Sequence, residues 1–172
     1  MKQVSLTVPL KKVPGQVWYL ALLVPKTMVS TLELGKDRRI ICEFSNELQI
    51  HCALMHDGKG DFFINLNKDT RKKLGLEEEA LVEIKIKVDD SKYGMPIPEE
   101  LQTAWQLDSD AKSLFDRLSI GKQRSLIHMV RKLKSSEKRI EKALIVLEYL
   151  KSVNGQLDYK ELNQAFKEAN KR

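Results

Sequence analysis

The segment from Lys122 to Lys142 contains eight Lys or Arg residues and two Glu residues. Its surplus of positive charge equals the formal net charge of the whole chain, +6. Lysine and arginine side chains bind phosphate and carboxylate groups, arginine through two parallel hydrogen bonds and lysine as a point charge. The residues that could form an anion-binding face are Arg124, Arg131, Lys132, Lys134, Lys138 and Arg139.

The same residues also fit the solvated sides of two amphipathic helices. Leu126, Val130 and Leu133 follow helical spacing and predict a buried line, with Arg124 and Arg131 on another face. Two interpretations stay open: an ordinary solvated surface, or a weak anion-binding face. The segment contains no nucleic-acid recognition motif and no aromatic residue on which a base could stack, so any nucleic-acid binding should be non-specific.

Other residues that could bind a ligand or catalyse a reaction give weaker signals. His51 and His56 would point to opposite faces of a strand, because their spacing is odd, and they do not match a zinc-binding pair. The sequence DGKGD at 57–61 is too short for a phosphate-binding loop and predicts a turn. No nucleophile motif is present. We expect no catalytic residue, no metal and no cofactor, and therefore no enzymatic activity.

The two cysteines lie in one predicted hairpin, with strands over 38–44 and 48–55. A tight turn at Asn46 and Glu47 would pair Cys42 with His51 and put Cys52 on the opposite face of the sheet. Two cysteines in this arrangement predict reduced thiols rather than a disulfide, which is typical of a cytoplasmic protein. The longest apolar run, 17–24, is too short to span a membrane and is followed by no signal cleavage site.

Residues 1–90 have the pattern of a small β-barrel. Short alternating segments such as 4–8 and 82–88 predict strands, and Gly-containing turns separate them. A short helix is predicted at 67–74 before Gly75. Trp18 and Tyr19 lie in a run that is apolar on both faces, where they could line a ligand cavity or pack in the core.

Residues 91–172 change to helical periodicity after a linker that contains Gly94, Pro96 and Pro98. Ser119 and Ser135 or Ser136 are predicted helix N-caps. One helix should bury a single stripe formed by Ile140, Ala143, Leu144, Leu147 and Leu150.

The segment 154–161 resembles half a calcium-binding loop. However, Leu150 would occupy the first ligand position, where a carboxylate is needed. The segment is better explained by a helix stop at Gly155 and a new N-cap at Asp158. The predicted fold class is thus α+β, a small barrel followed by a helical region.

The order of these motifs resembles a known family. The first half resembles a small barrel domain of unknown function, through the segments VPGQVWYLALLVP (13–25) and DGKGDFFINLNKDTRKKLGL (57–76). The second half resembles the helical YdeI/OmpD-associated, or bacteriocin-protection, region, through the segments MPIPEELQTAW (95–105), LFDRLSIGKQRSLIHMV (114–130) and SSEKRI (135–140). The family often has Gly-Asp at the place of Glu79-Ala80 and Ser-Pro at the place of Ser119-Ile120. The strand-to-helix element at 63–76 is also similar to that of AbrB/MazE split barrels, some of which bind DNA.

The resemblance implies a bacterial binding or interaction protein connected with envelope or antimicrobial-peptide stress. It implies no catalytic residues. The expected partner is a protein or an anionic molecule. Nucleic-acid binding is the alternative, for which Arg71, Lys72 and Lys73 are further candidates, and binding of a small molecule in a barrel cavity is a weaker one. A monomer in the cytoplasm is expected.

Overall fold

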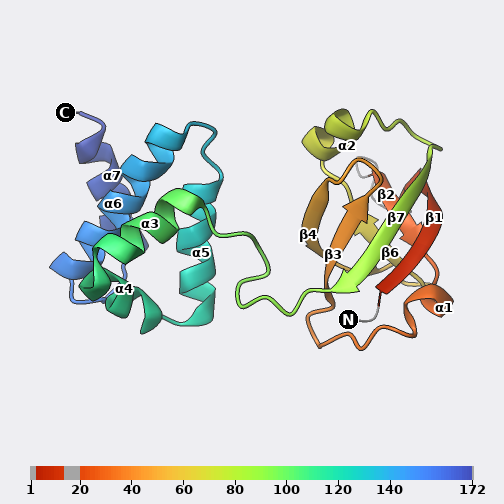
Figure 1. Ribbon diagram of the computed structural model, residues 1–172, viewed down its shortest axis with the longest axis horizontal. Helices are drawn as coiled ribbons and strands as arrows, with labels where there is room; N and C mark the ends of the chain where they lie inside the picture. The colour runs from red at the N-terminus through yellow and green to blue at the C-terminus, as the bar shows by residue number, and fades with distance from the viewer. Residues whose placement is uncertain (1–2, 14–19, 172) are drawn as a thin grey trace. The chain divides into compact units, whose positions relative to one another are not determined.

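The computed structural model describes residues 3–13 and 20–171, which form two compact units, Met1–Gly94 and Met95–Arg172. The first unit contains a β-sheet with two short helices, and the second is helical (Figure 1). The predicted α+β class, a barrel followed by a helical region, is confirmed. Within the described residues, no helix combines the length and the apolar character needed to cross a membrane.

The barrel is one antiparallel sheet with the strand order β4-β3-β7-β1-β2-β6-β5. It curls until it is nearly closed (Figure 1). Its strands are β1 (Gln3–Lys12), β2 (Leu20–Val24), β3 (Arg39–Phe44), β4 (Gln49–Ala53), β5 (Met55–His56), β6 (Phe62–Asn65) and β7 (Leu81–Val88).

Alternation of buried and exposed residues drives the sheet to close around a core. Leu6, Val8 and Leu10 of β1 point inward, as do Val82 and Ile84 of β7. Helices α1 (Lys26–Val29) and α2 (Lys68–Leu74) lie at opposite ends of the barrel (Figure 1). The sequence pattern predicted α2 and its stop at Gly75, but it predicted neither the side-chain cap from Asn67 nor the single turn of α1.

A single residue joins the two edges of the sheet. Strand β4 ends at Ala53 and β5 begins at Met55, although these strands occupy opposite ends of the strand order. Leu54 between them is 1% exposed, and its N–H donates to the carbonyl of Arg38 at 3.0 Å. The Arg38 guanidinium donates back to the carbonyl of Leu54 at 3.1 Å. The sequence pattern predicted one continuous strand over 48–55, so this crossing is a correction.

The β3–β4 hairpin has a three-residue loop, 45–47, instead of the predicted two-residue turn. Glu47 adopts a positive φ of 65°, and the N–H of Phe44 donates to the carbonyl of Leu48. The extra loop residue shifts the register by one, so Cys42 lies opposite Ile50 and His51 lies opposite Ile41. The predicted pairing of Cys42 with His51 is therefore wrong.

The shift also inverts the face of β4, because side chains alternate along a strand. Cys52 lies opposite Ile40 and thus shares a face with Cys42 instead of pointing away from it. Both cysteines are free thiols, and burial raises the pKa of each, that of Cys52 to about 12. Neither thiol is therefore a reactive thiolate at neutral pH.

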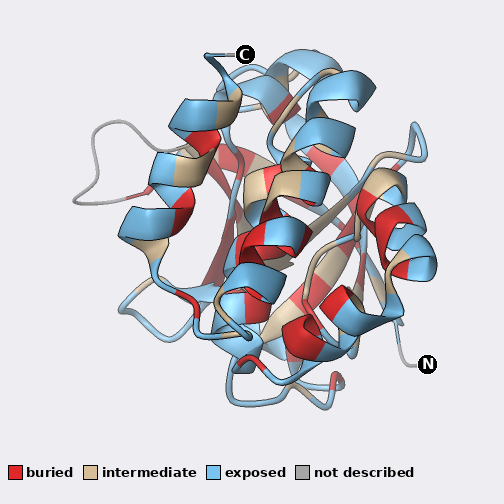
Figure 2. Ribbon diagram, turned by 90° about the vertical axis from the view of Figure 1, so that its left-hand side faces the viewer, coloured by how far each residue is buried: buried red, intermediate tan, exposed pale blue. Residues whose placement is uncertain are grey.

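The second unit is built around its longest helix. Helix α6 packs against each of the other four helices, which are less closely connected with one another. The buried residues of the helices lie mainly on one side of each helix (Figure 2). The helices are α3 (Glu99–Leu107), α4 (Ser109–Asp116), α5 (Ile120–Arg131), α6 (Ser136–Ser152) and α7 (Tyr159–Ala169).

Side-chain caps set the helix starts, as the sequence predicted. Ser119 and Ser135 accept hydrogen bonds from the first turns of α5 and α6, and Asp158 accepts two from the first turn of α7. Helix α6 ends at Ser152, and the turn after it contains Asn154 and the predicted Gly155 at positive φ, 48° and 78°. The hydroxyl of Tyr149 lies within hydrogen-bond distance of the N–H of Asp158 and of the carboxylate of Glu161. The Asp158 carboxylate thus caps α7, and the Glu161 carboxylate accepts a hydrogen bond from Tyr149.

The predicted apolar stripe of α6 is only partly buried. Ala143, Leu147 and Leu150 are in the core, but Ile140 and Leu144 are 46% and 47% exposed. Val146 and Tyr149 are buried instead. The buried surface of α6 therefore differs from the predicted stripe, because its position depends on how four other helices pack against α6.

A test of the barrel concerns Glu79, which has a φ of 69° in the turn before β7. The left-handed conformation costs a non-glycine residue roughly 1–2 kcal/mol, and the exposed ion pair of Glu79 with Lys11 recovers little. We expect Glu79→Gly to raise the free energy of unfolding by about 1 kcal/mol in urea titrations. The matched variant is Glu78→Gly, at a residue without positive φ, which should not stabilise. A stabilisation by both variants, or by neither, would contradict this account.

Candidate anion-binding site of the helical unit

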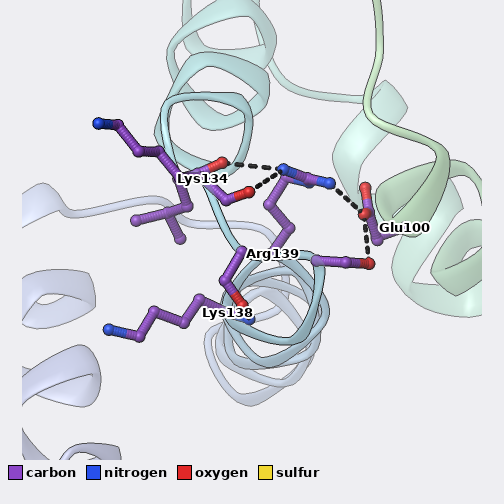
Figure 3. Close-up of polar contacts among 7 residues, drawn as sticks. Glu100, Lys134, Lys138 and Arg139 are labelled. Carbon is purple, nitrogen blue, oxygen red and sulfur yellow. Dashed lines mark hydrogen bonds and ion pairs between the residues drawn. The ribbon is translucent and has the colours of Figure 1, made fainter.

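The predicted basic residues do not form one continuous face. Arg131 and Arg139 line a shallow hollow of about 250 Å³ together with Glu99, Glu100 and residues 96–98. Lys134 and Lys138 extend away from Arg139 and Glu100 (Figure 3). Arg124 is half-buried on α5, and Lys134 is exposed in the α5–α6 turn. Neither residue lines this hollow, and neither lines a second hollow on the α7 side of α6. The basic residues of the segment thus divide between two sides of α6.

Arg139 serves the structure of the unit. Its guanidinium donates to the Glu100 carboxylate at 2.7 Å and to the carbonyls of Leu133 and Lys134 at 3.0 and 3.1 Å (Figure 3). Glu100 also accepts a hydrogen bond from the Ser136 hydroxyl at 2.7 Å. The hydrogen bonds from Arg139 and Ser136 lower the pKa of Glu100 to about 2. Arg139 therefore fastens α3 and the α5–α6 turn to α6, and most of its donors are engaged.

On the α7 side of α6 lies a second concavity of about 210 Å³, which we call the lysine hollow. Its apolar floor comes from Leu133, Ile145 and Phe166, and its polar rim comes from Lys138 and Lys142 together with Glu141 and Asn170. Lys132, in the turn after α5, is close enough to Lys142 to influence its charge. The lysine hollow, with Lys132 beside it, is the candidate binding site.

Lys142 lies at the border between the charged rim and the apolar floor. Its ammonium group is 3.9 Å from the centre of the Phe166 ring, a cation–π contact. Desolvation by burial and the nearby charge of Lys132 lower the pKa of Lys142, and Glu141 offsets this only in part. Within the described residues, Lys132, Lys138 and Lys142 form no ion pair. A bound anion would relieve the repulsion between these cations.

Sequence reasoning named Lys132 and Lys138 but missed Lys142. Lys138, Lys142 and Ile145 have the spacing of one helix face, i, i+4 and i+7, which was a usable signal. The contribution of Phe166 could not be read in the same way, because it depends on how α7 packs against α6. Of the further basic candidates on α2, Lys72 and Lys73 are exposed in its last turn, where positive charge stabilises a helix end.

The barrel has a hollow whose lining carries more negative than positive charge. A concavity of about 620 Å³ lies over β1, β7 and the β3–β4 loop, and its lining includes Glu43, Glu47 and Glu83 but only one lysine, Lys85. An anion would be repelled there. The predicted cavity residues Trp18 and Tyr19 lie outside the residues that the structure describes.

A buried carboxylate, Asp89, organises a polar cluster at the end of β7. The side chain of Asp89 is 1% exposed, and it lies 2.9 Å from Nδ1 of His51 and accepts hydrogen bonds from the N–H and the hydroxyl of Ser91. Burial favours the neutral acid, but the hydrogen bonds from Ser91 and His51 outweigh it and lower the pKa of Asp89. The carboxylate stands between Ser91 and His51, whereas nucleophilic catalysis needs the histidine beside the hydroxyl. The cluster therefore anchors the start of the linker to β4.

No metal-binding set was found among the described residues: no three His, Cys, Asp or Glu side chains are grouped as ligands. His51 and Cys52 lie on opposite faces of β4, as neighbours on a strand do.

The comparisons with known proteins match one family model to the barrel and another to the helical region. Residues 7–86 match a domain of unknown function (DUF1905), and residues 94–152 match the model described as bacteriocin-protection, YdeI or OmpD-associated. No curated protein matches the chain. Together the matches and the fold define a class of two-part proteins, a small barrel followed by a helical region. Residues 94–152 are similar to the YdeI/OmpD-associated family and residues 7–86 to the domain of unknown function, so the resemblance seen in the sequence is confirmed.

The role of Asp89 can be tested through the pH dependence of stability. Because its pKa is lower in the folded chain than the ordinary 3.8, ionised Asp89 stabilises the fold above that pH, and this contribution is lost as the pH falls through the folded-state pKa. We expect Asp89→Asn to reduce the free energy of unfolding at pH 7 by about 1–3 kcal/mol, with a smaller difference from wild type at pH 3. Urea titrations at both pH values measure this, with exposed Asp90→Asn as the control. An equal loss at both pH values would refute the proposed charge dependence.

The lysine hollow can be tested by the titration of Lys142. Proton–carbon NMR at the lysine Cε should show a midpoint below the ordinary pKa of 10.5. Lys132→Gln should raise this midpoint without restoring it fully, because burial is the larger cause of the shift. Lys73→Gln, in the barrel, should leave it unchanged. A normal pKa for Lys142, or no response to Lys132→Gln, would show that the two lysines are not close.

Proposed function

We propose that this chain is a non-enzymatic binding protein whose helical unit holds an anionic partner in the lysine hollow. The setting would be protection against bacteriocins or related antimicrobial peptides. That setting is supported by the description of the matched helical region. The proposal that the chain is not an enzyme is supported by the Asp89 cluster, in which the carboxylate rather than the histidine receives the hydrogen bond of the Ser91 hydroxyl.

The observation that carries the proposal is the excess of positive charge at a concave surface, where Lys138 and Lys142 with Lys132 nearby exceed the single negative charge of Glu141. Surface lysines are usually dispersed in water, where their mutual repulsion is weak. Here Lys142 is partly desolvated and repelled by Lys132, which lowers its pKa. A site of this kind stabilises an anion more than an open lysine-rich surface does, and it disfavours a cationic peptide.

Nucleic acid is the weaker candidate for the anionic partner. Single strands bind to proteins through a charged groove and through aromatic faces on which bases stack. Phe166 is 7% exposed, and Lys142 lies over its ring, so the ring offers a base little stacking surface. Random oligonucleotides should therefore bind without specificity, with a dissociation constant on the order of 10⁻⁴–10⁻⁶ M that weakens steeply with salt.

The test uses the full chain labelled with ¹⁵N and a decaglutamate peptide as the probe anion. We expect shift changes centred on Lys132, Lys138 and Lys142, and an affinity that falls with increasing salt. The variant with Lys132→Gln, Lys138→Gln and Lys142→Gln should bind at least tenfold more weakly. The matched control, with Lys36→Gln, Lys59→Gln and Lys73→Gln in the barrel, removes the same charge and should bind as wild type does.

Equal loss of binding in both triple variants would mean that only net charge matters, and it would refute the site. A second titration, with oligonucleotides across a salt series, tests the alternative. Tight binding of one nucleotide sequence at physiological salt, lost in Arg124→Ala with Arg131→Ala, would favour nucleic-acid recognition instead.

A further inference from the structure

The lysine hollow combines charge with an apolar floor, and this combination selects among anions. Its rim cations lie beside Leu133, Ile145 and Phe166, which a polyanion would not use. The volume, about 210 Å³, is below the roughly 300–1,000 Å³ of pockets that enclose drug-sized ligands. The hollow therefore suits one small ligand, or one terminal group of a larger ligand.

The charges of the hollow favour a single negative charge. Lys132, Lys138 and Lys142 provide the cations, but Glu141 is also part of the lining. A group with several adjacent charges, such as polyphosphate, would meet repulsion from Glu141, whereas each side chain of decaglutamate brings a single carboxylate. Asn170, on the same rim, can donate or accept a hydrogen bond.

The position of Lys142 determines how such a ligand would lie. Its ammonium group rests on the Phe166 ring, so an anionic head that pairs with Lys142 brings the atoms next to it against the apolar floor. An ion without an apolar group would leave this floor in contact with water. The ligand that satisfies both surfaces has a charged head and a short apolar tail.

From this geometry we infer that the lysine hollow binds a small amphiphilic anion, with one carboxylate or phosphate head and a short alkyl or aromatic group. The inference rests on the proposed function and specifies the ligand class of the same site. The head pairs with Lys138 and Lys142, and the apolar group displaces water from Leu133 and Ile145, which are half-buried beside the buried Phe166. The two sources of the head, a carboxylic acid or a phosphate ester, share this chemistry and are separated by experiment.

Calorimetric titration of the full chain with acetate, butyrate, hexanoate and octanoate, at constant ionic strength, tests the inference. Each methylene that enters the floor should raise the affinity about fourfold, which corresponds to roughly 0.8 kcal/mol per buried CH₂, until the hollow is full. Hexyl phosphate distinguishes the source of the head, and hexylamine should bind at least tenfold more weakly than hexanoate. If hexyl phosphate binds more tightly than hexanoate, the head is a phosphate ester.

Two variants on neighbouring positions of α6 provide the control. Ile145→Thr changes the floor and should reduce the chain-length dependence, whereas Leu144→Thr changes an exposed residue outside the hollow and should not. Equal affinities of acetate and octanoate in wild type would overturn the inference but leave anion binding intact. Equal affinities of hexylamine and hexanoate would also overturn it. If neither these anions nor decaglutamate bind, the proposed function fails as well.

Discussion

The helical unit depends on the packing of four helices around α6, so one helix contacts all the others. On one flank, Arg139 pairs with Glu100 and Lys151 pairs with Asp108, so that the beginning and the end of α3 are both held. On the other flank, Lys142 lies on Phe166 of α7. The basic residues of α6 therefore separate into cations that hold helices together and cations that remain available to a ligand.

Much of the architecture could be predicted because local patterns agree with the fold. Period-two alternation in β1 and β7, helical periodicity after Pro98, and the caps at Ser119, Ser135 and Asp158 all depend on residues close in sequence. The fold class followed from these patterns, and the order of the motifs led to the family. Interactions between neighbouring residues can be recognised without knowledge of what lies across the core.

The predictions that failed concern features that depend on contacts between residues distant in the sequence. One extra loop residue, with Glu47 at positive φ, inverted β4, because a register shift of one moves every side chain to the other face. The exposure of Leu144 depends on which sides of α6 the other four helices cover. Similarly, basic residues that are adjacent in sequence proved to line different hollows, and the floor contributed by Phe166 required the position of α7.

The pairing of β1 with β7 affects how the chain acquires its structure during synthesis. Gln3 lies opposite Lys87, so the first and last strands of the barrel are neighbours at the centre of the sheet. The hairpins β3–β4 and β5–β6 can form as soon as they leave the ribosome, but β1 has no partner on its β7 side until β7 has emerged. Nearly the whole barrel sequence must therefore be translated before its core closes, and chaperones have that interval in which to bind the exposed apolar face of β1.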